Sequence, residues 1–260
     1  MTDDASRELA LAIADTTLAA GLRYGRWVER APSTEEQVAV SSMSQDKLGQ
    51  ARQFYQIAEA SFDVDAVELQ YDRGPDAFAW NPAWLAPWPS WGHFVVAQIT
   101  LGRGLLEDLS ALAEGTSLRE PFAKIQQEDS WHARHGSAWL SQVGDDEDAR
   151  EHFQAALDDL WPPIVAYYGV VGEERFPEDR EAGVVTRSDD GKRQRLLDEI
   201  VPQLEDAGLE VPASRGDDGW TTKPSPTQDH LARVREAGEA TAIELAAMLQ
   251  DPEHRALAEL

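Results

Sequence analysis

Residues 128–136 read EDSWHARHG and belong to a longer stretch, residues 122–143, whose spacing predicts the fold. Seven positions of that stretch follow alternating steps of three and four residues: Phe122, Ile125, Asp129, His132, Gly136, Trp139 and Val143. Such spacing puts side chains on one face of a helix, the face that packs into the core of a helical bundle. Asp129 and His132 are therefore predicted to lie on a buried stripe.

A second helix repeats this arrangement. Its apolar stripe is predicted at six positions: Val40, Met43, Lys47, Gln50, Phe54 and Ile57. Lys47 and Gln50 are three residues apart, so two helices each bring an i, i+3 polar pair to the interior. A first helix contributes Thr17 to its own stripe, and a helix that begins near Trp91 carries Gly102 beside its stripe.

The rest of the chain is predicted to be helical as well, which indicates an all-α bundle with additional C-terminal helices. Helices are expected at residues 2–28, 33–60, 91–114, 118–143, 145–169, 192–208 and 227–249, the fifth interrupted at Pro162 and Pro163. No strand pattern of useful length is found. We expect a bundle over residues 1–212, a polar linker over 213–226, and a C-terminal helix over 227–260 that packs on the bundle.

Composition limits the function. The 260 residues include no cysteine, which excludes disulfides, iron–sulfur clusters and cysteine nucleophiles. The N-terminus lacks the pattern of a signal peptide and no apolar run is long enough to span a membrane, so we expect a cytoplasmic protein. A net charge of −25 with four lysines suggests a halophilic surface, or alternatively an acidic face for a basic partner. Nucleic-acid binding is disfavoured because phosphates would be repelled.

The polar residues of the stripes occur where di-iron bundles carry their metal. Such bundles use a Glu on each of two helices and Glu-x-x-His on the other two, and iron favours carboxylate and imidazole ligands. Here the second helix offers Lys47 and Gln50, and Asp129 and His132 remain as metal ligands. We therefore expect no di-iron centre, and we predict instead that the Lys47 ammonium is buried against the Asp129 carboxylate. A single weakly held metal on Asp129 and His132, or a Lys47 that reaches to solvent, are the alternatives.

Two stretches resemble a known family. APSTEEQVAVSSMSQDKLGQARQFYQIAEA at residues 31–60 and KIQQEDSWHARHGSAWLSQVG at residues 124–144 are similar to the ferritin-like subunits of the phenylacetyl-CoA ring epoxidase. AALDDLWPPIVAYYG at residues 155–169 and LEDAGLEVP at residues 204–212 extend the resemblance over residues 9–212. The family has a catalytic di-iron subunit and a homologous structural subunit.

The resemblance implies the structural subunit. The catalytic subunit is expected to carry Asp-Glu-x-Gly-His where this chain has Asp46-Lys47-Leu48-Gly49-Gln50. The expected acids of two further helices fall near Thr17 and Gly102, so the family's site is degenerate here and only Asp129 and His132 are kept. It follows that this chain binds no cofactor and has no catalytic residue, that iron resides in the homologous catalytic partner, and that a reductase and other subunits complete the complex.

Two other functions remain open from the sequence. The chain could be a catalytic ferritin-like oxygenase subunit with an atypical metal site, or a stand-alone helical bundle that binds acyl-CoA.

A proline-rich segment contains four tryptophans: Trp80, Trp84, Trp88 and Trp91. They are interpreted either as a rigid lid packed on the chain's own bundle or as contacts for a partner protein.

Overall fold

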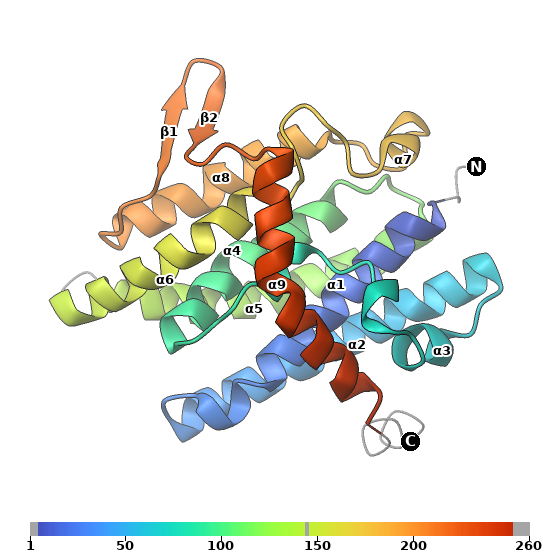
Figure 1. Cartoon of the computed structure of the whole chain (residues 1–260), viewed down its shortest axis with the longest axis horizontal. Coiled ribbons are helices and arrows are strands. Elements are labelled where there is room, and N and C mark those ends of the chain that lie inside the picture. The colour runs from blue at the N-terminus through green and yellow to red at the C-terminus, as the bar shows by residue number, and fades with distance from the viewer. Residues whose placement is uncertain (1–4, 144–145, 252–260) are drawn as a thin grey trace.

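An all-α ferritin-like bundle is built around α4 (Trp91–Ser110) in the computed structural model, which describes residues 5–143 and 146–251. α4 packs against α5 (Phe122–Ser141), α6 (Glu147–Val165) and α8 (Asp189–Asp206), and it also touches α1 (Arg7–Gly25). α1 and α2 (Thr34–Phe62) lie along each other as an antiparallel pair (Figure 1). The predicted all-α class is confirmed.

The helix boundaries follow local capping chemistry. The α2 N-cap is Ser33, whose hydroxyl accepts a hydrogen bond from the backbone N–H of Glu36, as the sequence around residues 31–40 predicts. Ser6 caps α1 in the same way, so this helix starts at Arg7, whereas residues 2–4 of the predicted helix lie outside the described part of the chain. The buried stripe of α4 is apolar almost throughout, with Phe94, Leu101 and Leu109 fully enclosed.

Two predictions about secondary structure are wrong. Pro162 and Pro163 do not interrupt α6, because they fall in its final turn and the helix ends at Val165. Residues 213–222, predicted to be part of a linker, form a hairpin of β1 (Ala213–Gly216) and β2 (Gly219–Thr222) paired antiparallel from Ala213↔Thr222 to Gly216↔Gly219. Its four-residue strands are largely exposed, so they leave no alternation of apolar residues in the sequence.

The C-terminal helix α9 (Gln228–Leu249) crosses the front of the bundle at an angle to the helices behind it (Figure 1). It contacts the 3-10 turn at Pro82–Leu85 and α6. Residues 252–260 of the predicted C-terminal segment lie outside the described residues. Two short helices, α3 (Ala66–Tyr71) and α7 (Pro177–Glu181), complete the structure, and none of the helices described here is long and apolar enough to cross a membrane.

Candidate functional site: a buried ion pair between α2 and α5

The structure brings together the polar pairs of α2 and α5. The Lys47 ammonium Nζ lies 2.8 Å from both Oδ1 and Oδ2 of Asp129. Only 1% of the Lys47 side chain and 8% of the Asp129 side chain are exposed to solvent. The aliphatic part of Lys47 runs inside the bundle, so this lysine does not reach bulk water.

The neighbours of this pair complete its hydrogen bonding. Gln50 Oε1 accepts a hydrogen bond from Lys47 Nζ at 3.1 Å, and Gln50 Nε2 donates one to Glu128 Oε2 at 2.9 Å. Glu128 in turn pairs with Lys124 one helical turn before it, at 3.4 Å. The buried ammonium and carboxylate are thus tied through Gln50 to the surface of α5.

His132 adds a second polar link between the same helices. Its Nε2 lies 3.1 Å from Asp46 Oδ2, and its Nδ1 lies 3.4 Å from Asp129 Oδ1. Burial lowers the pKa of His132 below its ordinary 6.5, and the Lys47 charge lowers it further, against an opposing effect of Asp129 and Asp46. The imidazole is therefore neutral at pH 7.

A cavity of about 100 Å³ opens beside the ion pair. Gly102 of α4 lines it together with Lys47 of α2 and with Asp129 and His132 of α5, and α8 also contributes to its wall. The contribution of α1 is not Thr17, as predicted, but Tyr24, whose buried hydroxyl has no hydrogen-bond partner within the described residues. Burial raises the pKa of Tyr24 well above its ordinary value, and the Asp129 carboxylate raises it further.

Thr17 lies elsewhere on the buried side of α1. It is fully buried and its hydroxyl donates to the backbone carbonyl of Ile13 at 2.7 Å. Both Thr17 and Tyr24 belong to the buried stripe of α1, and the two differ by about two helical turns in height. Spacing along one helix does not reveal which of them stands level with Lys47.

The donor set does not fit the di-iron centre that the fold implies. A di-iron centre needs several carboxylates and imidazoles directed at two cations. Here Lys47 donates to both oxygens of Asp129, which are the atoms that a metal would need, and a protonated amine cannot ligate. Among the described residues, no group of three or more His, Asp or Glu side chains is arranged to hold a metal ion.

A further polar chain, which includes His135, runs along the same seam. His135 Nε2 lies 2.5 Å from Glu36 Oε2, and its Nδ1 lies 3.1 Å from Gln98 Oε1. Gln98 Nε2 donates to the backbone carbonyl of His132 at 2.9 Å. The spacing of three residues between His132 and His135 is visible in the sequence, whereas the partners Glu36 and Gln98 lie on other helices and no local pattern marks them.

The four tryptophans pack inside the chain. Trp84 is fully buried, Trp80 and Trp88 are 7% and 5% exposed, and Trp91 is partly buried. Tyr24 lies edge-on to Trp84 with ring centroids 6.0 Å apart, and the Arg23 guanidinium sits 3.9 Å from the centre of a Trp88 ring. This burial favours the rigid-lid interpretation and removes these tryptophans as exposed contacts for a partner.

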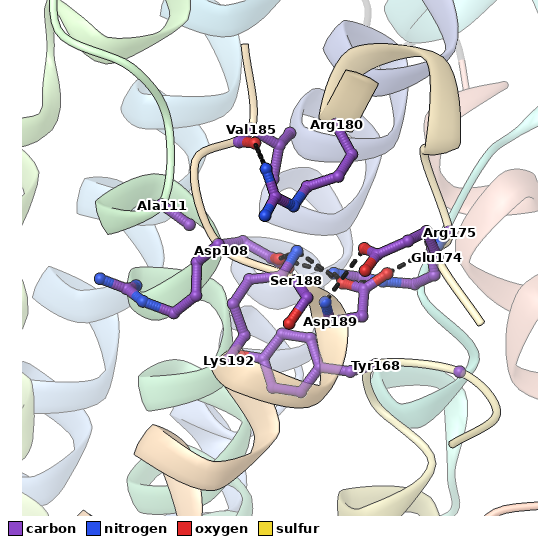
Figure 2. Close-up of polar contacts among 12 residues, drawn as sticks. Asp108, Ala111, Tyr168, Glu174, Arg175, Arg180, Val185, Ser188, Asp189 and Lys192 are labelled. Atoms are coloured by element: carbon purple, nitrogen blue, oxygen red, sulfur yellow. Dashed lines mark hydrogen bonds and ion pairs between the residues drawn. The ribbon is translucent and has the colours of Figure 1, made fainter. Parts of the chain in front are cut away.

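A second buried charge cluster includes Asp108, close to the C-terminal end of α4 (Figure 2). Lys192 Nζ is 2.5 Å from Asp189 Oδ1 and 3.1 Å from Asp108 Oδ1, and an Arg175 guanidinium nitrogen is 2.5 Å from the same Asp108 oxygen. Burial disfavours the Asp189 carboxylate, but Arg175 and Lys192 outweigh this and hold its pKa below the ordinary value. Two acids balance two bases, so the cluster anchors the segment around residue 175 to α4 and α8.

Comparisons with known proteins agree with the resemblance of the sequence. The profile of the family described as phenylacetic acid catabolic protein matches residues 1–246. Two subunits of the 1,2-phenylacetyl-CoA epoxidase of Escherichia coli (strain K12), designated A and C, are similar to this chain. The first is 26% identical over 204 residues, which cover 74% of this chain and 63% of the relative. The second is 30% identical over 161 residues, which cover 58% of this chain and 62% of the relative.

The chain thus spans less than two thirds of the length of either relative, and it is similar to both kinds of subunit. The profile match, in contrast, extends over nearly the whole sequence. Together with the helical bundle and the polar pairs of α2 and α5, it shows that this chain belongs to the phenylacetic acid catabolic protein family.

Proposed function

We propose that the chain is the non-catalytic structural subunit of a multicomponent phenylacetyl-CoA epoxidase and pairs with a homologous di-iron catalytic subunit. The observation that carries the proposal is the Lys47 ammonium, which lies 2.8 Å from both oxygens of a buried Asp129. An oxygen-activating subunit would need acid and imidazole ligands at these positions of α2. The relatives supply the reaction, because both are named as subunits of a 1,2-phenylacetyl-CoA epoxidase.

In this role the ion pair replaces the charge of a metal. A carboxylate buried between helices needs a cation beside it, and Lys47 provides one that stays covalently attached to α2. Gln50 accepts a hydrogen bond from the same ammonium, so the interior keeps its polar groups satisfied without iron. The chain would then retain the bundle shape that a homologous partner recognises, while oxygen chemistry takes place in the partner with electrons from a reductase subunit.

The test is co-expression with a homologous chain that carries the full set of iron ligands. We expect the two chains to co-purify, iron to reside in the partner, and phenylacetyl-CoA-dependent oxygen consumption to require both chains plus the reductase. The isolated chain, loaded with ferrous iron and desalted, is expected to retain far less than one iron per chain.

Two outcomes would support the alternatives instead. Near-stoichiometric iron in the isolated chain, lost in Asp129→Asn, would indicate a catalytic subunit with an atypical metal site. Binding of phenylacetyl-CoA by the isolated chain, with no association to the homologous chain, would indicate a stand-alone acyl-CoA-binding bundle.

A further inference from the structure

We propose that a pocket between α1, α4 and α9 binds a small aromatic carboxylate, that is, a single ring that carries one carboxylate group. The α1–α9 pocket is defined here by side chains within residues 9–16 of α1, 79–83 before α4, and 231–235 of α9, together with Leu105 and Asp108 of α4 and side chains within residues 166–176. This inference goes beyond the proposed function and does not depend on it, because it concerns a ligand of the isolated chain.

The α1–α9 pocket is separate from the cavity beside Lys47. On α1, Thr16 is the last residue that lines the α1–α9 pocket, whereas Tyr24 lines the cavity of the ion pair. The step from position 16 to position 24 corresponds to about 12 Å along the helix axis. Among the described residues, none lines both spaces. A ligand in the α1–α9 pocket would therefore leave the contact between Lys47 and Asp129 untouched.

The wall of the α1–α9 pocket is mostly apolar and suits one aromatic ring. Leu9, Ile13 and Leu105 are buried there, and so are the rings of Trp80 and Tyr167. The volume of the pocket is about 160 Å³. In another protein, a cavity of about 150 Å³ lined by apolar side chains binds benzene. The pocket is therefore large enough for a six-membered ring with one small substituent and too small to enclose a coenzyme.

Hydrogen bonds fix the wall before any ligand binds. The backbone N–H of Asn81 donates to Thr16 Oγ1 of α1 at 3.1 Å, and Asn81 Nδ2 donates to the backbone carbonyl of Tyr167 at 2.9 Å. The neighbouring Trp80 ring stacks on Phe78 with ring centroids 4.5 Å apart. Since the segment before α4 is tied to α1 and to residue 167, a ligand pays little for ordering the pocket.

Arg235 identifies the charged group of the ligand. Three charged residues line the pocket, and two of them, Asp108 and Arg175, already pair with each other at 2.5 Å. The third, Arg235, is exposed and forms no ion pair with any residue in the ranges 5–143 and 146–251. It shares one face of α9 with Leu231 and Val234, which also line the pocket, because these positions are spaced i, i+3, i+4. A ring that enters between the apolar side chains can thus place a carboxylate beside this guanidinium.

The first experiment titrates the isolated full chain with para-fluorobenzoate and follows the ligand by fluorine NMR. We expect one saturable site with a dissociation constant on the order of 1 mM, as for a ligand of this size. Ala12→Leu adds three carbon atoms to a partly buried wall position, so it should weaken binding by about 10-fold or more. The matched control is Ala39→Leu, at a partly buried position of α2 outside the pocket, which should bind like the wild type. Thermal unfolding confirms that both variants are folded.

The second experiment isolates the role of charge. Arg235→Gln should weaken binding of para-fluorobenzoate by about fivefold, the effect expected for an exposed ion pair. Arg233→Gln removes an exposed arginine of the same helix that does not line the pocket, and it should change binding by less than about twofold. The neutral analogue para-fluorobenzyl alcohol should bind the wild type more weakly than the acid does, and Arg235→Gln should not alter its affinity.

Two sets of results would overturn the inference. The absence of saturable binding up to about 10 mM para-fluorobenzoate, or binding that survives in folded Ala12→Leu, would show that the pocket does not take the ring. Equal affinities for the acid and the alcohol, or equal losses in Arg233→Gln and Arg235→Gln, would show that no carboxylate is held at Arg235. Because the charge variants alter exposed side chains, this second comparison decides the question even if Ala12→Leu fails to fold.

Discussion

The ion pair between Lys47 and Asp129 should contribute strongly to stability only while both partners are present. In Lys47→Met the Asp129 carboxylate would stay buried without a cation, and we expect a loss of about 3–5 kcal/mol in the free energy of unfolding. In Lys47→Met/Asp129→Leu no charge is left uncompensated, so most of that loss should be recovered. Denaturation with urea at pH 7 measures both values.

The matched control is Lys124→Met, which removes a lysine from the same network at the surface. Lys124 is 65% exposed and pairs with Glu128 at 3.4 Å, so its loss should cost less than about 1 kcal/mol. If Lys47→Met were as mild as Lys124→Met, Lys47 would not be the buried cation that the structure places beside Asp129.

His132 should make the protein less stable in mild acid. Burial and the Lys47 charge hold its pKa below the ordinary 6.5 of an unfolded histidine, so the unfolded chain binds a proton more readily than the folded one. The stabilisation that this pKa difference gives the folded state is complete above pH 6.5. It is lost as the pH falls from 6.5 towards the pKa of His132 in the folded protein. A titration of its ring protons by NMR should show a midpoint below 6.5.

The same effect should appear in unfolding measurements between pH 7 and 5. His132→Gln should show a shallower decline in the free energy of unfolding than the wild type. The variant lacks the group at position 132 that binds a proton more readily in the unfolded state than in the folded state. His93 and His230 also have lowered pKa values through burial, so part of the decline should remain. An unchanged slope in the variant would contradict the assignment to His132.

At the scale of elements, the approach of α5 to α4 depends on Gly136. A Cβ atom at this position would lie 2.5 Å from Ile99 Cγ1 and 3.0 Å from its Cδ1. Gly136→Ala should therefore destabilise the protein by about 1–3 kcal/mol despite the better helix propensity of alanine. Gly49→Ala on α2, where no atom lies within 4 Å of the new Cβ, should be neutral or stabilising by about 1 kcal/mol. Thermal unfolding of the two variants measures the contrast, and an equal response would show that α4 and α5 are less tightly packed than described.

The helical elements were largely predictable because their signals are local. The three–four spacing in α2 and α5 placed Lys47, Gln50, Asp129 and His132 on the buried stripes, and all four are buried. The continuation of α6 through Pro162 was not predictable from the rule that proline breaks helices. That rule concerns the interior of a helix, and here the two N–H groups that the prolines lack belong to the final turn.

The candidate site was less predictable because it depends on how helices stand relative to one another. Sequence spacing identifies the inner face of α1 but not the height at which that face meets Lys47, so Tyr24 took the place expected for Thr17. The cluster of Asp108, Arg175, Asp189 and Lys192 joins residues up to 84 positions apart, and no local pattern marks such contacts. The burial of Trp80, Trp84 and Trp88 likewise depends on tertiary packing.

At the scale of the whole molecule, net charge should make stability rise with salt. A charge of −25 repels itself in the folded state, and at 1 M ionic strength the screening length falls to about 3 Å. Exposed ion pairs such as Arg26–Glu244 and Arg215–Asp198 would weaken, but each contributes less than about 1 kcal/mol. The buried pairs at Lys47 and Lys192 are shielded from added ions.

We therefore expect the melting temperature to increase steadily from 0.01 to 1 M KCl, with most of the gain at the lower concentrations where the screening length changes fastest. Sodium chloride at equal ionic strength should give the same curve, since screening depends on charge and not on the identity of the ion. As a control, a variant that replaces several exposed glutamates by glutamine should start at a higher melting temperature and gain less from salt. A melting temperature that falls with salt would mean that attraction between surface charges outweighs their net repulsion, and the −25 charge would then be no basis for a halophilic surface.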